Sequence, residues 1–192
     1  MHLEQYLNAL TTRLESAFGD HLSGVFLVGS ASVGAYVQGR SDVDILVAVD
    51  HADRASLQRV VTTCSHEALP CPATKLELVV YELDVLASPA WPPRWSLNFD
   101  TGKSTHQIDF DPDTQPAHWF VLDLAFAHRH ALALYGEAEI GDPGDEAVAR
   151  AFEEMLEWFE ANEPDALPVA RDRAEHWRRT RTFKPKPGLP SP

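Results

Sequence analysis

Apolar residues recur with a helical period at the start of the chain and with a strand period soon after. The first pattern, from Leu3 to Phe18, predicts a helix that ends at Gly19. A continuous apolar run then predicts a buried strand, and apolar–polar alternation predicts two more strands. In chain order, the pattern places helices or strands at residues 3–18, 24–28, 42–49, 52–68 and 75–81. Helix and strand therefore alternate over residues 1–85, which favours an α/β unit.

The pattern changes after residue 88. Prolines recur through residues 88–117 and exclude long regular elements, so we predict an irregular segment there. Its aromatic residues either anchor the segment to the core or wall a substrate pocket; they are Trp91, Trp95 and Phe99. Helical spacing returns over residues 117–135 and ends at Gly136. A second amphipathic helix is predicted to start near residues 142–145.

The stretch between the first two predicted strands carries the candidate chemistry. Asp42 and Asp44 are two residues apart, and because side chains alternate along a strand, their carboxylates point the same way. At ~4 Å and an effective dielectric of ~20, they would repel each other by about 4 kcal/mol. A divalent cation relieves this repulsion, and oxygen ligands suit Mg²⁺. Beside them, the backbone after Gly29 and the hydroxyl of Ser30 can bind phosphate oxygens. With Ser41 in the turn that leads into the strand, these residues predict a site for a metal-bound nucleoside triphosphate.

This pattern of Gly-Ser, a later Gly and then Ser-Asp-x-Asp resembles the DNA polymerase β-like nucleotidyltransferase superfamily. That superfamily has a third carboxylate on a later strand, and Glu77 matches it. An unpaired charge among alternating apolar residues would otherwise be costly. Over residues 20–160 the chain is similar, in more detail, to the streptomycin/spectinomycin (aminoglycoside) adenylyltransferases. The segments that carry this resemblance are Leu76–Tyr81, Pro93–Phe99, and Asp123 with His130 ahead of Ala133–Gly136.

The resemblance implies an α/β (α+β) fold, with a polymerase β-like nucleotidyltransferase core that contains a mixed sheet, followed by a short helical region. We expect the nucleotidyltransferase domain in residues 1–110 and the helical region, shortened relative to the family, in residues 111–165. Residues 166–192 are predicted to be a basic, proline-rich, disordered tail. This tail has seven Lys and Arg residues against two acidic residues, a net charge of +5, which leaves −18 for residues 1–165.

The resemblance also implies a Mg²⁺-dependent enzyme that transfers AMP from ATP to a hydroxyl of a small molecule, such as an aminoglycoside antibiotic. Asp42 and Asp44 would hold Mg²⁺, and Glu77 would accept the hydroxyl proton or complete the metal site. Asp123 and His130, seven residues apart on one helix face, would contact the acceptor, unless they form only a surface ion pair. Two alternatives stay open. One is an enzyme that adenylylates a protein, and the other is a non-catalytic module that binds nucleotide or a partner but has lost turnover.

Charge and composition narrow the partners. The net charge of −13, from 16 Lys and Arg against 29 Asp and Glu, would repel nucleic acid and attract a cationic small molecule, although it also serves plain solubility. We predict no membrane partner, since no apolar run approaches membrane length. The N-terminus lacks the features of a signal peptide, so a cytoplasmic protein is expected. Cys64 and Cys71 are predicted to be reduced, buried thiols.

Overall fold

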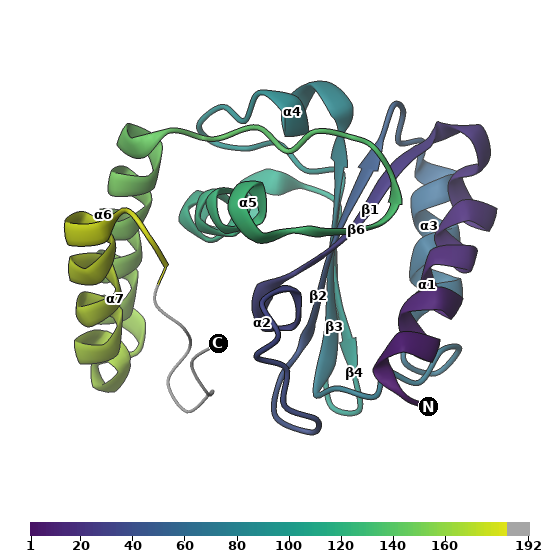
Figure 1. The fold of residues 1–192 in the computed structure, drawn as a ribbon, viewed down its shortest axis with the longest axis horizontal. Helices are drawn as coiled ribbons and strands as arrows, with labels where there is room; N and C mark the ends of the chain where they lie inside the picture. The colour runs from purple at the N-terminus through teal and green to yellow at the C-terminus, as the bar shows by residue number, and fades with distance from the viewer. Residues whose placement is uncertain (184–192) are drawn as a thin grey trace.

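A mixed β-sheet runs through the protein in the computed structural model, which describes residues 1–183 (Figure 1). Within these residues the sheet has six strands in the order β5-β4-β3-β2-β1-β6. Only the central pair, β2 and β3, is parallel, and the other neighbours are antiparallel. The strands are β1 Leu22–Val28, β2 Val43–Val49, β3 Lys75–Glu82, β4 Leu97–Gly102, β5 His106–Asp109 and β6 Leu132–Gly136. The expected α+β fold with a mixed sheet is thus confirmed.

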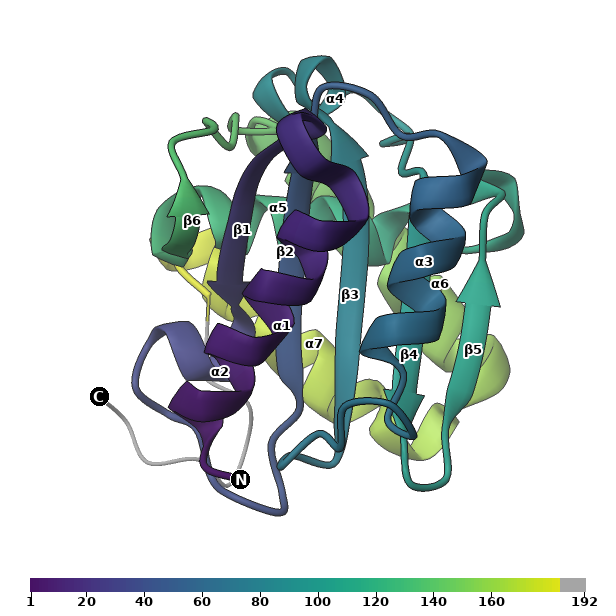
Figure 2. The same cartoon turned by 90° about the vertical axis from the view of Figure 1, so that its right-hand side faces the viewer.

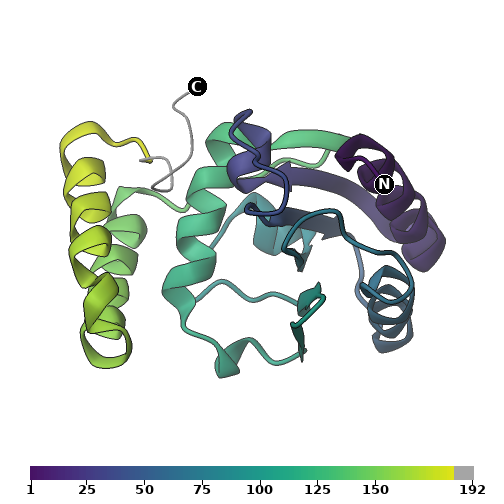
Figure 3. The ribbon, with the colours of Figure 1, turned by 90° about the horizontal axis from the view of Figure 1, so that it is seen from below.

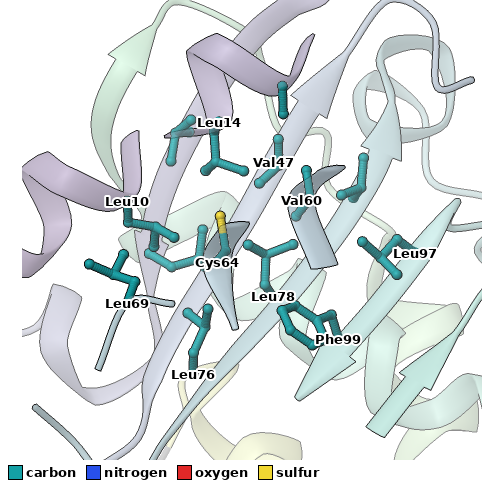
Figure 4. Packing of buried hydrophobic residues seen from close by; sticks show 14 of the residues in the cluster. Leu10, Leu14, Val47, Val60, Cys64, Leu69, Leu76, Leu78, Leu97 and Phe99 are labelled. Carbon is teal, nitrogen blue, oxygen red and sulfur yellow. The ribbon is translucent and has the colours of Figure 1, made fainter. Parts of the chain in front are cut away.

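Two helices, α1 (Leu3–Phe18) and α3 (Arg54–Cys64), cover one face of this sheet (Figure 2). The start of α3 is fixed by Asp53, whose carboxylate accepts the backbone N–H groups of Ala55 and Ser56 at 2.8 and 3.0 Å. Figure 4 shows how the apolar side chains of both helices pack against alternate residues of the strands. Among the residues of this core are Leu10, Leu14, Val60 and Cys64 of the helices, and Val47, Leu76, Leu78, Leu97 and Phe99 of the sheet.

On the other face, α5 (Ala117–His130) lies between the sheet and a pair of helices, α6 (Asp145–Asn162) and α7 (Leu167–Thr180) (Figure 3). Phe120 and Leu124 of α5 pack toward the sheet. The neighbouring residues Val121 and Leu122 pack instead against α6 and α7. The two faces of α5 therefore belong to two separate apolar cores. The remaining short elements are η1 Gly19–His21, α2 Gly29–Ser32, α4 Leu83–Ala87, η2 Pro112–Thr114 and η3 Pro164–Ala166.

The helix predicted over residues 117–135 is too long, because α5 ends at His130 and residues 132–136 form β6. At Ala131 the backbone turns to the extended conformation, with φ −63° and ψ 139°. The following segment pairs with the outer edge of β1, where Gly24 lies opposite Gly136. A hydrogen-bonding edge thus overrode the helical spacing of the apolar residues. Because β6 joins the sheet, the sheet also extends beyond residue 110, and the predicted domain boundaries stay predictions.

The segment 88–117 was predicted to be irregular, which is wrong for its central part, since it contains β4 and β5. The prolines lie on either side of these strands and none interrupts them. Leu97 and Phe99 alternate toward the core of α1 and α3, and Trp95 is buried beside Phe120, at 5.2 Å between the two ring centroids. Trp95 and Phe99 therefore anchor this segment to the core.

The tail predicted over residues 166–192 is also helical over α7, so the prediction of disorder there is wrong. Ala170, Ala174 and Trp177 recur at helical spacing and are buried against α5 and α6. Residues 184–192 lie outside the described residues. None of the helices formed by residues 1–183 has the length and apolar content that a membrane-spanning helix needs. Cys64 and Cys71 are free and buried, and burial raises the pKa of the Cys64 thiol to about 11.

Candidate active site

Three carboxylates lie in register across neighbouring strands of the sheet. Asp44 on β2 pairs with Glu77 on β3, and Glu77 pairs with Asp100 on β4. Their strand neighbours Ile45 and Leu78 point into the core of α1 and α3, so the carboxylates lie on the face that carries α5. Adjacent strands are about 4.8 Å apart, which brings the three carboxylates close together. The two sequence-predicted members, Asp44 and Glu77, thus belong to one row, whereas Asp100 was not predicted from the sequence.

The turn after β1 lies directly beside the carboxylate of Asp44. Val28 is the register partner of Asp44, and Gly29 follows with φ +62°. A Cβ atom at Gly29 would lie only 1.8 Å from Oδ2 of Asp44. Glycine is therefore required at this position both by the backbone conformation and by the carboxylate. Ser30, next in the chain, is the second residue of the short α2.

A cavity of about 270 Å³ lies between the carboxylate row and helices α5, α6 and α7. It brings together most of the residues that the sequence predicted for the site. Those that line it are Gly29, Ser30, Asp44, Glu77, Asp123 and His130. Asp123 and His130 come from one side of α5, as their spacing of seven residues predicted. Aromatic side chains complete the wall, namely Tyr81, Phe120, Phe126, Phe152 and Phe183.

Two predicted site residues do not line this cavity. Ser41 is buried, and its hydroxyl accepts the backbone N–H of Val37 at 2.9 Å, so it closes the loop before β2. Asp42 lies one residue before the first residue of β2. Its charge contributes to raising the pKa of both Asp100 and Cys71.

A lysine lies among the carboxylates. The Nζ atom of Lys75 is 2.5 Å from Oε1 of Glu77 and 2.7 Å from Oδ2 of Asp100. Burial lowers the pKa of Lys75, but the hydrogen bonds to Asp100 and Glu77 outweigh this and raise it above its ordinary value. Burial and the neighbouring Glu77 raise the pKa of Asp100, which Lys75 opposes. Lys75 was not predicted as a site residue, although its spacing of two residues from Glu77 puts both side chains on one face of β3.

The cavity also receives a guanidinium from α7. Arg173 lines it, and burial lowers the pKa of Arg173, while the charge of Asp123 acts in the opposite direction. Asp123 similarly adds to the burial that raises the pKa of Tyr81 well above its ordinary value. Arg173 was missed because it lies in the predicted tail. The available signal was the helical spacing of Ala170, Ala174 and Trp177 around it.

The fit of Mg²⁺ to the site can be judged from its donor set. Asp44 and Glu77 offer carboxylate oxygens, which Mg²⁺ prefers. Asp44 lies directly beside Gly29, and a larger residue at position 29 would displace the carboxylate of Asp44. The described residues contain no group of three or more His, Cys, Asp and Glu side chains arranged to hold a metal ion. The predicted trio of Asp42, Asp44 and Glu77 is therefore not assembled as one metal cluster, although its oxygen donors suit Mg²⁺.

The chain is similar to known proteins in its fold. No protein-family model and no curated protein match the sequence. The crystal structure of the spectinomycin adenyltransferase AAD(9) from Enterococcus faecialis with ATP and spectinomycin superimposes with a TM-score of 0.72 at 17% sequence identity. The match covers 96% of this chain and 79% of that chain. The chain shares the fold of that adenyltransferase. This fold match takes in more of the chain than residues 20–160, on which the sequence resemblance rests.

Two other structures are similar at lower TM-scores. A toxin–antitoxin with AMP-PNP gives a TM-score of 0.35 at 12% identity, covering 86% of this chain and 96% of that chain. A toxin–antitoxin MntA-HpeT mutant gives 0.31 at 11% identity, with 84% and 93% coverage.

Proposed function

We propose that the protein is an adenylyltransferase that transfers AMP from ATP to a hydroxyl of a small molecule. The observation that carries this proposal is the meeting of Asp44, Glu77 and the Gly29–Ser30 turn in one cavity. The carboxylates suit the metal ion of a metal-bound triphosphate, and the turn beside them suits its phosphate groups. The shared fold with a spectinomycin adenyltransferase crystallised with ATP supports the same reading.

In this proposal each group has one role. Asp44, together with Asp42, would hold Mg²⁺, and the bound ion would neutralise charge on the phosphates. The backbone after Gly29 and the hydroxyl of Ser30 would donate hydrogen bonds to phosphate oxygens. Arg173 would face the same charges from α7.

The transfer itself needs a proton acceptor. The acceptor hydroxyl oxygen attacks the α-phosphorus, a new O–P bond forms, and the bond between the α-phosphorus and the bridging oxygen to the β-phosphate breaks. Pyrophosphate leaves with the bond electrons, and Glu77 takes the hydroxyl proton. AMP is then joined to the acceptor.

The acceptor is proposed to be cationic and rich in hydroxyl groups, as aminoglycosides are. Asp123 and His130 project into the cavity from α5, opposite the carboxylate row. The ring of Phe126 lies 4.8 Å from that of His130 and gives this part of the wall an apolar surface. Asp123 would pair with an ammonium group and His130 would hydrogen-bond a hydroxyl.

The test measures pyrophosphate release and transfer of α-labelled ATP onto a panel of aminoglycosides and onto cellular proteins. Asp44→Asn should lower transfer by about 100-fold or more, because the charge that holds the metal is lost. Asp165→Asn, at an exposed site away from the cavity, is the matched control and should leave transfer unchanged. Transfer of the label to proteins but to none of the aminoglycosides would show that the acceptor is a protein and not a small molecule. ATP binding without transfer to any acceptor would leave a non-catalytic module and contradict the proposal.

A further inference from the structure

The sheet has two edges, and they differ in how they are protected. One edge is β5, a short strand with polar side chains. Here the carboxylate of Asp109 accepts hydrogen bonds from the side-chain amides of Gln107 and Gln115, at 3.0 and 2.8 Å. Charged and polar side chains on an edge strand oppose pairing with another chain. The β5 edge is therefore protected against association.

The other edge is β6, which lies at one margin of the sheet in Figure 2 and, among the described residues, pairs with β1 alone. Its sequence, Leu-Ala-Leu-Tyr-Gly, contains no charged residue and no proline. Ala133 and Gly136 are exposed, and the Leu132 side chain is 50% exposed. An uncharged edge strand presents N–H and C=O groups that can pair with a further strand. The β6 edge therefore lacks the protection that β5 has.

Charges of opposite sign flank β6. Arg129 precedes the strand, at the end of α5, and Glu137 and Glu139 follow it. All three side chains are exposed, and within residues 1–183 none of them forms an ion pair. The Arg129 guanidinium donates instead to the backbone carbonyl of Arg181. A strand with a basic and an acidic end is complementary to a second copy of itself that runs in the opposite direction.

We propose that two copies of the chain form a two-fold symmetric dimer through antiparallel pairing of their β6 strands. The sheet then continues from one copy into the other, and each β6 gains backbone hydrogen bonds along its outer edge. Complete overlap of the five-residue strands places Leu134 of the two copies opposite each other. In this register the half-exposed Leu132 lies opposite Gly136 of the second copy, which has no side chain to obstruct it. The same register brings Arg129 toward Glu139 of the second copy.

Two observations favour a second copy over another occupant of this edge. The complementary charges lie at the two ends of one strand, and a two-fold axis uses both ends twice, so that both contacts are attractive. Residues 184–192 of the chain contain four prolines, which lack the N–H group that a β-ladder needs. Because the paired strands are short, the dimer dissociates on dilution. This inference does not depend on the proposed transfer of AMP.

The first test is analytical ultracentrifugation of the full-length chain, from about 1 to 100 µM. The average mass should rise with concentration from that of one chain toward that of two. Leu132→Lys should raise the dimer dissociation constant by about 10-fold or more, because it removes an apolar contact and puts a charge on the edge. Val169→Lys, at a 45% exposed position on α7, is the matched control and should leave the constant unchanged. A monomer at every concentration, or equal constants for the two variants, would contradict the proposal.

Charge reversal tests the antiparallel register. Arg129→Glu and Glu139→Arg should each weaken the dimer by about 10-fold, because each places like charges at both ends of the paired strands. A mixture of these two variants should associate as tightly as the unsubstituted protein, since every contact again joins opposite charges. Arg171→Glu and Glu160→Arg, at exposed positions on α7 and α6, control for the change in net charge. A mixture no tighter than either variant alone would overturn the register. If circular dichroism shows that Arg129→Glu does not fold, Glu139→Arg and Leu132→Lys still test the interface.

Hydrogen exchange at low and high protein concentration locates the interface. The amides of β6 should exchange more slowly at the high concentration, whereas those of β5 should not change. Slower exchange in β5 but not in β6 would place the interface at the wrong edge and contradict the proposal. Dimerisation only after deletion of residues 184–192 would assign the edge to the chain's own C-terminal residues, and it would contradict the proposal as well.

Discussion

Gly29 lies so close to Asp44 that the smallest side chain would collide with the carboxylate. Gly29→Ala should therefore displace Asp44, lower nucleotide binding and transfer by about 10-fold or more, and cost more than the ~1–2 kcal/mol that a left-handed backbone imposes on alanine. Gly39 has a similar φ of +75° with no atom within 4 Å of its would-be Cβ, so Gly39→Ala measures the backbone cost alone. Urea denaturation and transfer assays compare the two. Equal losses in both variants would show that the carboxylate contact is unimportant.

His118 on α5 is buried, and within residues 1–183 its Nε2 atom finds no hydrogen-bond partner. Burial lowers its pKa, with the charge of Glu154 acting against the shift. Because the folded pKa is below the unfolded one, the unfolded chain binds a proton that the folded chain does not as the pH falls through the unfolded value of about 6.5. Stability should drop as the pH falls through that region and level off below the folded pKa.

His118→Phe should reduce this pH dependence. The measurement is the free energy of unfolding in urea at pH 7.5 and pH 5.5, for the variant and the unsubstituted protein. His51→Phe, at an exposed site, controls for the loss of a histidine. An identical difference between the two pH values in all three proteins would show that His118 is protonated equally in both states.

At the residue scale, the sequence predicted those site residues whose partners lie on adjacent strands. Asp44 and Glu77 could be found because alternation assigns them a face, and Gly29 because a small-residue turn follows a buried strand. Asp100 could not be recognised, since its strand was predicted as irregular. Ser41 was assigned to the nucleotide because its neighbours are site residues, whereas its hydroxyl closes a loop.

Among the elements, α7 contributes to the cavity although its sequence looks like a charged tail. Arg173→Met should raise KM for ATP by about 10-fold or more, since hydrogen bonds to charged groups are worth about 1.5–3 kcal/mol. Arg179→Met removes the same charge from an exposed position on the same helix and should change KM little. Steady-state kinetics with varied ATP makes the comparison, and circular dichroism checks that α7 remains folded. An equal change in KM for ATP in both variants would show that Arg173 acts only through its contribution to the net charge.

The elements that sequence patterns misassigned share one cause, which is that distant partners decide their conformation. Residues 132–136 carry apolar residues that continue a helical pattern, and only the free edge of β1 makes them a strand. Between Pro93 and Pro112, the alternation of Leu97 and Phe99 was present but the flanking prolines dominated the prediction. In α7, arginines outnumber the buried residues. The three buried residues, Ala170, Ala174 and Trp177, were too few for the helical pattern to be recognised.

For the molecule as a whole, the net charge of −13 should steer cationic ligands toward it. Exposed charges are screened beyond about 8 Å at physiological salt, so this attraction should weaken as salt is added. Streptomycin carries more positive charge than spectinomycin, and its dissociation constant should therefore rise more steeply between low and high NaCl. Calorimetric titrations at several salt concentrations measure both slopes. Equal slopes would show that long-range charge does not contribute to binding, and absence of binding for both drugs would remove the aminoglycoside acceptor.

The carboxylate row and the helix that faces it come from parts of the chain made at different times. Gly29, Asp44 and Glu77 lie on neighbouring stretches whose pairing closes short loops, whereas Arg173 arrives from far along the sequence. During synthesis, the sheet half of the cavity can form before α7 has left the ribosome. Lys75 belongs to the same strand as Glu77, so its positive charge is in place from the moment that β3 pairs. A growing chain would thus hold Asp44 and Glu77 together only with the positive charge of Lys75 on the same strand as Glu77. Pulsed hydrogen exchange during refolding can test this order, because β1, β2 and β3 should gain protection before α7.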